Sequence, residues 1–266
     1  MADKIAFLFM HGVAPDLSQE KRPGYSRPMY DALMNQMQKR GVDTSAFRRF
    51  EVNWSPVTFG FKKRMAKLQF DTPPARRSFV PGKNMIQNTL RNFIYPAVID
   101  ILFYVKNKGS ITNKDKMPEM ELLHQATKNI YRRGFRKVVL LAHSLGSVAA
   151  YDYVFRFEER YPFPEHLELT CLVTFGSPVA LFASGMGYPM STKIKRPAYA
   201  KKWINLWDFD DPIATRLLPH FPKKFSKDFL TDIPVDTAFM NPIAAHSGYW
   251  TNSKVIEHIA EELQAK

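Results

Sequence analysis

Residues 136–150, RKVVLLAHSLGSVAA, decide the fold of this chain. The apolar run over 138–141 has the composition of a buried strand and leads to Ser144, and the small residues that follow favour a tightly packed helix. A strand, a sharp turn with a serine at its tip and a helix form the context of a nucleophile elbow, where the serine hydroxyl projects above the sheet edge. Strand and helix nearly touch at such a turn, and Gly146 and Ala142 are small enough to allow it. The stretch therefore predicts that Ser144 is a nucleophile.

The composition is that of an ordinary soluble globular protein. With 266 residues, 45% of them hydrophobic, the chain suits a single α/β domain over residues 1–266. Its one cysteine, Cys171, excludes an internal disulfide and fits a reducing compartment. The apolar start at 5–10 is too short for a secretory signal, and the longest apolar stretch, 93–105, is shorter than the ~20 residues of a spanning helix. We therefore expect a cytoplasmic protein that is at most peripheral to a membrane.

The chain is strongly basic, with a formal net charge of +13. Its basic residues cluster at 62–64, 76–77, 132–133, 193–196, 201–202 and 223–224. A solvated basic surface explains these clusters, and attraction to an anionic membrane surface or an anionic substrate is the alternative. No recognised nucleic-acid motif accompanies the charge, so a nucleic acid is not an expected partner. The oligomeric state does not follow from the sequence.

Apolar runs that fit strands alternate with amphipathic helical patterns along the chain. The expected strands are 4–10, 47–54, 138–141, 167–175 and 202–207, with a possible short last strand at 233–235. Helices are expected over 26–41, 119–133 and 252–263, the first of them capped by Ser26. This alternation predicts a mostly parallel central sheet with helices on both faces. Ligands bind such sheets at the carboxyl ends of the strands.

Residues 56–116 are longer than a usual connection between strands and are predicted to form a helical, lid-like insertion. Two helical patterns, over roughly 57–70 and 84–106, flank turns rich in proline. Apolar residues of this segment are candidates to line an acyl pocket, with ordinary lid or core packing as the alternative: Phe59, Phe61, Met65, Phe70, Phe93, Ile94 and Phe103.

A serine hydroxyl is a poor nucleophile until a base takes its proton, and a carboxylate must orient that base. After a nucleophile elbow the expected order along the chain is serine, acid, histidine. Of the seven histidines, three follow the candidate acids: His220, His246 and His258. We predict His246 as the base, in a loop just before the last helix. His220 is expected in a turn and His258 on the solvated side of the terminal helix.

The acid is expected directly after the strand at 202–207, where three aspartates follow one another closely. Asp211 precedes Pro212, and the rigid turn would hold its carboxylate still. Asp211 is therefore favoured, with Asp210 as the main competitor, and Asp208 is expected to end the strand by accepting bonds from backbone groups.

The oxyanion of an acyl-transfer reaction needs two preorganised backbone amides. Leu145, the residue after the nucleophile, is predicted to supply one, and Val13 in the first loop the other, with Gly12 allowing close approach. We interpret His11 and His143 as packing or loop-bracing residues.

Taken together, these segments resemble α/β-hydrolases of the lipase and esterase type. The matching pieces are FLFMHGVA (7–14), VVLLAHSLGSVAAYD (138–152), LVTFGSPV (172–179), INLWDFDDPIA (204–214) and AHSGYW (245–250). Residues 175–178 and 211–213 are similar to the GPI-inositol-deacylase-like and related bacterial lipase-like branches, where the aspartate before the proline is the triad acid. Asp100 and Tyr104 also resemble a helix of that branch, and we interpret Asp100 as structural or pocket-lining.

The resemblance covers nearly the whole chain, more loosely over 56–116, and departs from the usual G-x-S-x-G motif at Ala142. It implies a sheet whose main strands follow the order 2-1-3-4-5. It also implies hydrolysis of a small-molecule or lipid ester through an acyl-enzyme, without a metal or organic cofactor. Thioesterases and phospholipases use the same three residues. The alternative from another class is a basic, membrane-associated interaction protein that retains the hydrolase fold.

Overall fold

The computed structural model of the protein describes residues 4–12, 24–54, 101, 104, 117–185, 196–221, 228–238 and 241–264. The chain divides into two compact units: the first comprises Met1–Gly12, Gly24–Val52 and Glu119–Lys266, and the second comprises Val13–Pro23 and Asn53–Pro118. Nearly all of the second unit lies outside the described residues, including Asp100 and every candidate for the acyl pocket. The single-domain organisation and the lid-like insertion at 56–116 therefore stay predictions.

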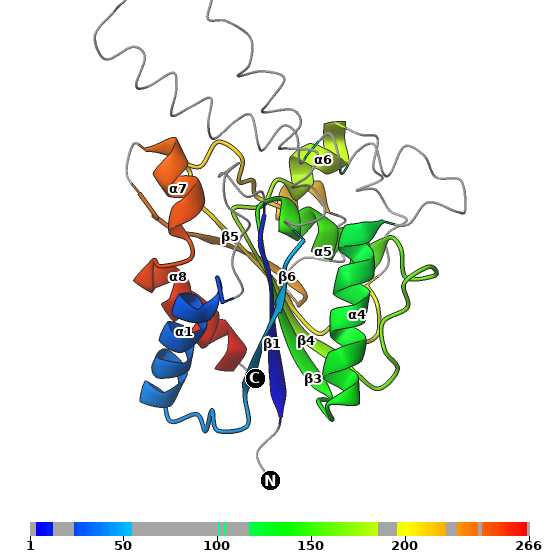
Figure 1. The fold of residues 1–266 in the computed structure, drawn as a ribbon. Coiled ribbons are helices and arrows are strands. Elements are labelled where there is room, and N and C mark those ends of the chain that lie inside the picture. Colours follow the sequence, from blue (N-terminus) through cyan, green and yellow to red (C-terminus); the bar gives the residue numbers. More distant parts are fainter. Residues whose placement is uncertain are drawn as a thin grey trace, which may run out of the picture. The chain divides into compact units, whose positions relative to one another are not determined.

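A six-stranded parallel sheet forms the centre of the described part of the first unit, with the order β2-β1-β3-β4-β5-β6 (Figure 1). Its strands are β1 (Ile5–Met10), β2 (Arg48–Val52), β3 (Lys137–His143), β4 (Glu168–Phe175), β5 (Trp203–Trp207) and β6 (Leu230–Pro234). This is the sheet expected for the α/β-hydrolase fold, so the predicted fold class and strand order are confirmed. The last strand lies slightly earlier in the chain than the predicted 233–235.

Helices cover both faces of this sheet, as the alternating pattern predicted. The described helices are α1 (Arg27–Lys39), α4 (Pro118–Arg132), α5 (Leu145–Phe155), α6 (Val179–Gly185), α7 (Pro242–Gly248) and α8 (Ser253–Gln264), with a 3₁₀ turn η1 (Leu218–His220). Figure 1 shows α1 and α8 on one side of the strands and α4 on the other. Because side chains alternate along a strand, Phe7 and Phe9 of β1 and Val139 and Leu141 of β3 face the core shared with α1 and α8.

The start of α1 is held by Glu51 of the neighbouring strand. Ser26 occupies the N-cap position but its side chain makes no capping bond. Instead its hydroxyl and its N–H donate to Glu51 Oε1 at 2.6 and 2.9 Å, and the Gly24 N–H donates to Glu51 Oε2 at 2.7 Å. The predicted N-cap position of Ser26 is therefore confirmed, but its side chain does not cap the helix. A carboxylate brought in by β2 is a stronger acceptor than the serine hydroxyl, and negative charge is favourable at a helix start.

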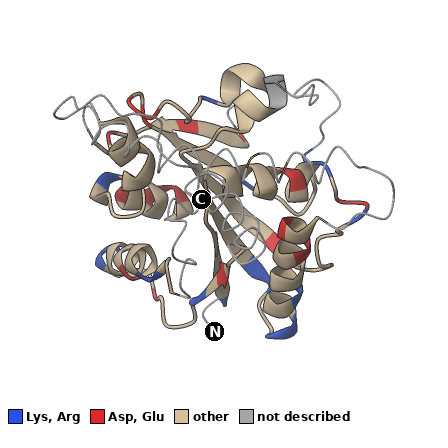
Figure 2. Cartoon of the chain, turned by 45° about the horizontal axis from the view of Figure 1, so that its top comes forward, with Lys and Arg blue, Asp and Glu red and all other residues tan. Residues whose placement is uncertain are grey.

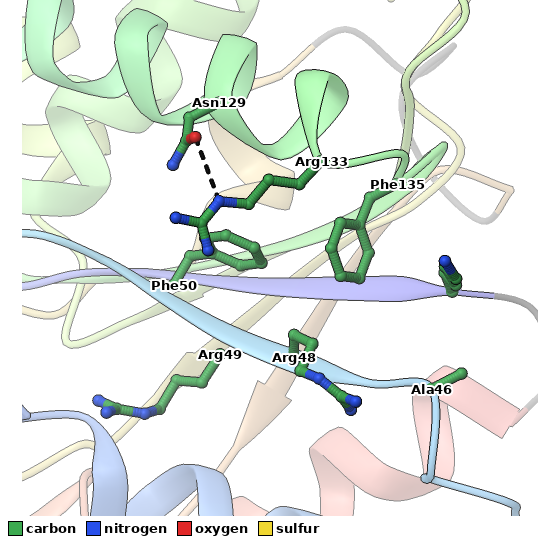
Figure 3. A pocket seen from close by; sticks show the side chains of 8 residues that line it. Ala46, Arg48, Arg49, Phe50, Asn129, Arg133 and Phe135 are labelled. Carbon is green, nitrogen blue, oxygen red and sulfur yellow. Dashed lines mark hydrogen bonds between the residues drawn. The ribbon is translucent and has the colours of Figure 1, made fainter.

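A cavity of about 400 Å³ lies beside the edge strand β2 (Figure 3). The Arg133 side chain extends over the Phe50 ring, 5.8 Å from its centroid, and donates to Asn129 Oδ1 at 3.3 Å, while Phe50 meets Phe135 edge-on. Arg49 points away from this group and pairs with Glu51. Charged side chains along an edge strand oppose pairing with a second chain. We therefore interpret this basic surface as protection of the sheet edge. It lies at the start of the strands, whereas Ser144 follows the end of β3.

The charges of the described part are mixed in sign. Figure 2 shows basic and acidic residues interspersed over several elements. No helix among the described residues is both long enough and apolar enough to cross a membrane. Most of the basic clusters lie outside the described residues, so the anionic surface stays a predicted partner.

Candidate active site

Ser144 lies at the sharp turn between β3 and α5. Its backbone angles are φ 52° and ψ −131°, a region that non-glycine residues rarely adopt and that costs ~1–3 kcal/mol. The turn is held on both sides: the Ser144 N–H donates to the carbonyl oxygen of Phe175 at 3.1 Å, and Ser147 donates to the Ser144 carbonyl oxygen from its N–H at 2.9 Å and its hydroxyl at 2.5 Å. The backbone therefore determines where the Ser144 hydroxyl points.

Two glycines let the end of β1 approach this turn. A Cβ atom on Gly12 would lie 2.4 Å from the Ser144 Cβ, and one on Gly146 would lie 2.4 Å from the carbonyl oxygen of His11. Both distances are far below van der Waals contact, so any larger residue would force the segments apart. The need for a small residue at Gly146 and the close approach allowed by Gly12, which were predicted separately, are both confirmed.

His246 lies between the predicted nucleophile and the predicted acid. Its Nε2 is 2.9 Å from Ser144 Oγ, and its Nδ1 is 2.9 Å from Asp211 Oδ2. All three residues are buried. Because a carboxylate only accepts hydrogen bonds, the neutral imidazole carries its proton on Nδ1 and presents a lone pair on Nε2 to the serine. The structure thus brings the three predicted residues together in the order that proton transfer needs.

His246 lies in the short helix α7, and the prediction of a loop is wrong. Asn241 is the N-cap, with its side chain accepting from the Ala244 N–H at 3.1 Å, and Pro242 occupies the first turn. Both residues are helix-start signals. A helix of seven residues is too short to show a hydrophobic period, so the sequence pattern did not reveal it.

The other two candidate histidines lie elsewhere. His220 is exposed in η1, and His258 in α8 has its Nδ1 3.5 Å from Glu261 Oε2. In the described part of the chain, no group of three or more His, Cys, Asp or Glu side chains is arranged to hold a metal ion.

Asp211 is the aspartate that reaches His246. Its Oδ2 accepts from the imidazole, and its Oδ1 accepts from the N–H groups of Ile213 and Ala214 at 3.0 and 3.3 Å. The tight turn after Pro212 supplies these two donors. Its own loop therefore fixes the carboxylate independently of the contact with His246.

The neighbouring aspartates have other surroundings. Asp208 accepts from the Asp210 N–H at 2.8 Å through Oδ1, and from the Thr237 N–H and hydroxyl at 2.6 and 2.7 Å through Oδ2. It therefore ends the strand as expected. Asp210 is partly exposed, and its N–H donates to Asp208 Oδ1. The choice between Asp210 and Asp211, which the sequence left open, falls to Asp211 on geometry.

One of the two predicted oxyanion amides belongs to a described residue. Leu145 is the first residue of α5, where an N–H has no carbonyl partner within its own helix and the helix dipole favours negative charge. Val13 lies outside the described residues, so the second amide stays a prediction.

His143 and His11 brace the surrounding loops, as expected. The His143 Nε2 donates to the His246 carbonyl oxygen at 2.8 Å, and its ring stacks on Phe175 with centroids 5.2 Å apart. The His11 Nδ1 lies 2.6 Å from the Gly12 carbonyl oxygen, and its ring meets Tyr25 edge-on.

Tyr249 is a residue of the site that the sequence did not single out. Its hydroxyl donates to Asp211 Oδ2 at 3.1 Å and accepts from the Asp208 N–H at 2.9 Å. Burial raises the pKa of the Tyr249 phenol well above its usual range, and the charge of Asp211 raises it further. The phenol therefore stays a donor. Its position three residues after His246 was the available signal, because that spacing places both side chains on one face of a helix.

The chain is similar to solved structures of hydrolases. No protein-family model matches the chain, and no curated protein matches its sequence. The esterase domain of a Rhodothermus marinus protein is 12% identical, with a TM-score of 0.43 over 97% of this chain and 83% of that chain. A Lactobacillus plantarum protein provisionally described as a cell-surface hydrolase is 14% identical, with a TM-score of 0.42 over 100% and 94%. A Xanthomonas campestris protein provisionally described as a hydrolase of the α/β superfamily is 12% identical, with a TM-score of 0.41 over 97% and 98%. These likenesses assign no role to any residue of this chain.

Proposed function

We propose that this protein is a serine hydrolase that cleaves carboxylic esters through an acyl-enzyme, with Ser144 as nucleophile, His246 as base and Asp211 as acid. One observation carries the proposal: the hydrogen-bonded series from Ser144 Oγ through both nitrogens of His246 to Asp211, built on a strained turn. A buried serine that merely supports packing needs neither this conformation nor this order of partners.

In the proposed first half-reaction, Ser144 Oγ attacks the acyl carbon while His246 Nε2 takes the hydroxyl proton. The C–O bond to the alcohol then breaks, and His246 gives its proton to the leaving alkoxide. In the second half, water repeats the attack on the acyl-enzyme and His246 again serves as base and then acid. Asp211 stays ionised throughout, keeping the proton on Nδ1 and stabilising the imidazolium.

The tetrahedral intermediate carries its negative charge on the former carbonyl oxygen. We propose that this oxygen accepts from the Leu145 N–H at the start of α5, and from Val13 in the loop that follows Gly12. Loss of a single such donor typically costs about 10²- to 10³-fold in kcat. The close approach of Gly12 to Ser144 supports this role for the first loop, because it brings the backbone within reach of the acyl group.

Labelling with a fluorophosphonate probe tests the proposed nucleophile. The wild-type protein should be labelled, Ser144→Ala should lose the label, and Ser177→Ala should keep it. Ser177 is the appropriate comparison because it also follows a strand and is buried, but its hydroxyl bonds to Ser147 and accepts from the Val179 N–H. Absence of label on the intact wild-type protein would overturn the proposal.

The substrate class is tested with p-nitrophenyl esters of increasing chain length, beside matched thioesters and a phospholipid. We expect turnover of the oxygen esters that disappears in Ser144→Ala. A protein that turns over thioesters while leaving every oxygen ester intact would contradict the ester assignment but keep the triad.

A further inference from the structure

Two side chains donate to the same carboxylate oxygen in the candidate active site. Asp211 Oδ2 accepts from His246 Nδ1 at 2.9 Å and from the Tyr249 hydroxyl at 3.1 Å. The Tyr249 oxygen in turn accepts the Asp208 N–H at 2.9 Å, so the phenolic proton is directed to Asp211. The proposed triad thus continues beyond its acid to a fourth side chain.

The local fold delivers the imidazole and the phenol as a pair. Tyr249 is the C-cap of α7 with helical backbone angles, φ −51° and ψ −34°, three residues after His246. The Tyr249 ring is fully buried, and a Cβ on Gly176 would lie 3.1 Å from its Cε2. Gly176 has φ 57°, so a glycine suits its backbone as well as the narrow space. These contacts keep the phenol against Asp211.

We propose that Tyr249 is a positioning residue of the triad, which holds Asp211 Oδ2 on the His246 imidazole and moderates the charge that this carboxylate presents to it. The inference rests on the proposed function. Tyr249 acts through Asp211 and touches no reacting atom, because Asp211 and His246 stand between it and Ser144.

The chemistry of a shared acceptor gives the sign of the effect. A donor on Asp211 Oδ2 draws electron density from that oxygen, which weakens its support for the imidazolium form of His246. When the donor is removed, the carboxylate supports the imidazolium more strongly, so the acid limb of the pH–rate profile moves to higher pH. The same removal frees the carboxylate to rotate, so proton transfer from Ser144 becomes less well aligned.

Removing the phenolic hydroxyl also removes the acceptor of the Asp208 N–H, and it changes no other titratable residue around the imidazole. Asp211 and Asp208 face this region from the loop after β5, and His143 faces it from β3 with its ring centroid 4.9 Å from that of His246. The Asp208 carboxylate keeps its bonds to Thr237, which do not involve the phenol. A change in the titration of His246 therefore reports on the Tyr249 hydroxyl.

The test is Tyr249→Phe, with Tyr153→Phe as the matched control. Tyr153 is equally buried, and its hydroxyl bonds to Thr127 at 2.8 Å, in the packing of α5 on α4 away from the triad. In Tyr249→Phe we expect kcat to fall about 2- to 10-fold with KM unchanged, the effect of losing the hydrogen bond to Asp211, and the acid limb of the kcat/KM profile to move to higher pH. Tyr153→Phe should lower the free energy of unfolding but leave both kcat and the acid limb of the profile unchanged.

An NMR titration of the His246 imidazole tests the inference without measuring turnover. The midpoint of the titration should move to higher pH in Tyr249→Phe and stay unchanged in Tyr153→Phe. If Ser144 labels and esters are cleaved but Tyr249→Phe matches the control in kcat and titration, the inference fails while the proposed function stands. If the wild-type protein neither labels nor cleaves, the proposed function fails, and the NMR titration still decides whether Tyr249 tunes His246.

Discussion

The side chain of His143 donates a hydrogen bond of 2.8 Å to the carbonyl oxygen of His246, 103 positions later in the chain. The residue before the proposed nucleophile therefore holds the helical turn that carries the proposed base. The His143 ring stacks on Phe175, whose carbonyl oxygen accepts the Ser144 N–H. Through these contacts, β3 and β4 set the position of α7 as well as that of the elbow.

Replacing His143 with phenylalanine should loosen that turn. An aromatic ring is kept, but the buried His246 carbonyl oxygen loses its donor, so we expect the free energy of unfolding to fall by about 1–3 kcal/mol. We expect a reduced kcat as well, because α7 carries His246. Urea denaturation and ester hydrolysis measure the two effects. His143→Gln, which retains a donor, should be milder, and equal losses in both variants would contradict this role for the hydrogen bond.

Asp211→Asn should nearly abolish activity while leaving the fold intact. An amide in place of the carboxylate favours the wrong imidazole tautomer and gives no charge to the imidazolium, so we expect kcat to fall about 10³- to 10⁴-fold. Asp210→Asn is the matched control, one residue away and partly exposed, and it should stay close to wild type. A larger loss in Asp210→Asn than in Asp211→Asn would reverse the assignment of the acid.

Gly146→Ala should destabilise the protein, although alanine is the better helix former by about 1 kcal/mol. Its Cβ would lie 2.4 Å from the His11 carbonyl oxygen, and relieving that overlap means moving backbone, at a cost of about 1–3 kcal/mol. Displacement of the elbow should also slow fluorophosphonate labelling of Ser144. Gly134→Ala is the comparison: its φ of 83° strains an alanine, but nothing lies within 4 Å of the new Cβ, so labelling should be unaffected. Normal labelling in Gly146→Ala would contradict the close-approach argument.

Glu51 should make stability depend on acid pH. Burial is the largest influence and opposes its ionisation, but hydrogen bonds from Ser26 and Gly24, with the charge of Arg49, outweigh it and hold the pKa of Glu51 below its usual value. The unfolded chain therefore takes up the proton at higher pH than the folded protein does. The stabilisation is complete above the unfolded pKa of about 4.3 and is lost as the pH falls through the folded value.

Glu51→Gln should accordingly be less stable than wild type at pH 7 and should show a weaker loss of stability on acidification. Urea denaturation between pH 7 and pH 3 measures both effects. Glu165→Gln, which changes an exposed carboxylate, should follow the wild-type pH dependence. If the free energies of unfolding of Glu51→Gln and wild type change with pH in the same way over the whole range, this role for Glu51 is contradicted.

The sequence by itself determined the features whose requirements are local. The sharp turn at Ser144 follows from an apolar run, a serine and small neighbours, because a turn between touching elements imposes those residue types within a few positions. The parallel sheet follows from alternating strand and helix patterns, which reflect burial on both faces. The order of serine, acid and histidine left three candidates for the base, and the position just before the last helix favoured His246, although the short helix that carries it was missed.

The tertiary structure alone decided which groups meet across long stretches of chain. Asp208, Asp210 and Asp211 are nearly equivalent in sequence, and only the approach of α7 shows that Asp211 reaches the imidazole. Only the tertiary structure shows that Tyr249 donates to the same carboxylate. It alone also shows that the Ser26 hydroxyl donates to Glu51 and does not cap its own helix. A hydrogen bond depends on the distance and direction between two atoms. Between residues far apart in the chain, these are set by how the helices pack on the sheet.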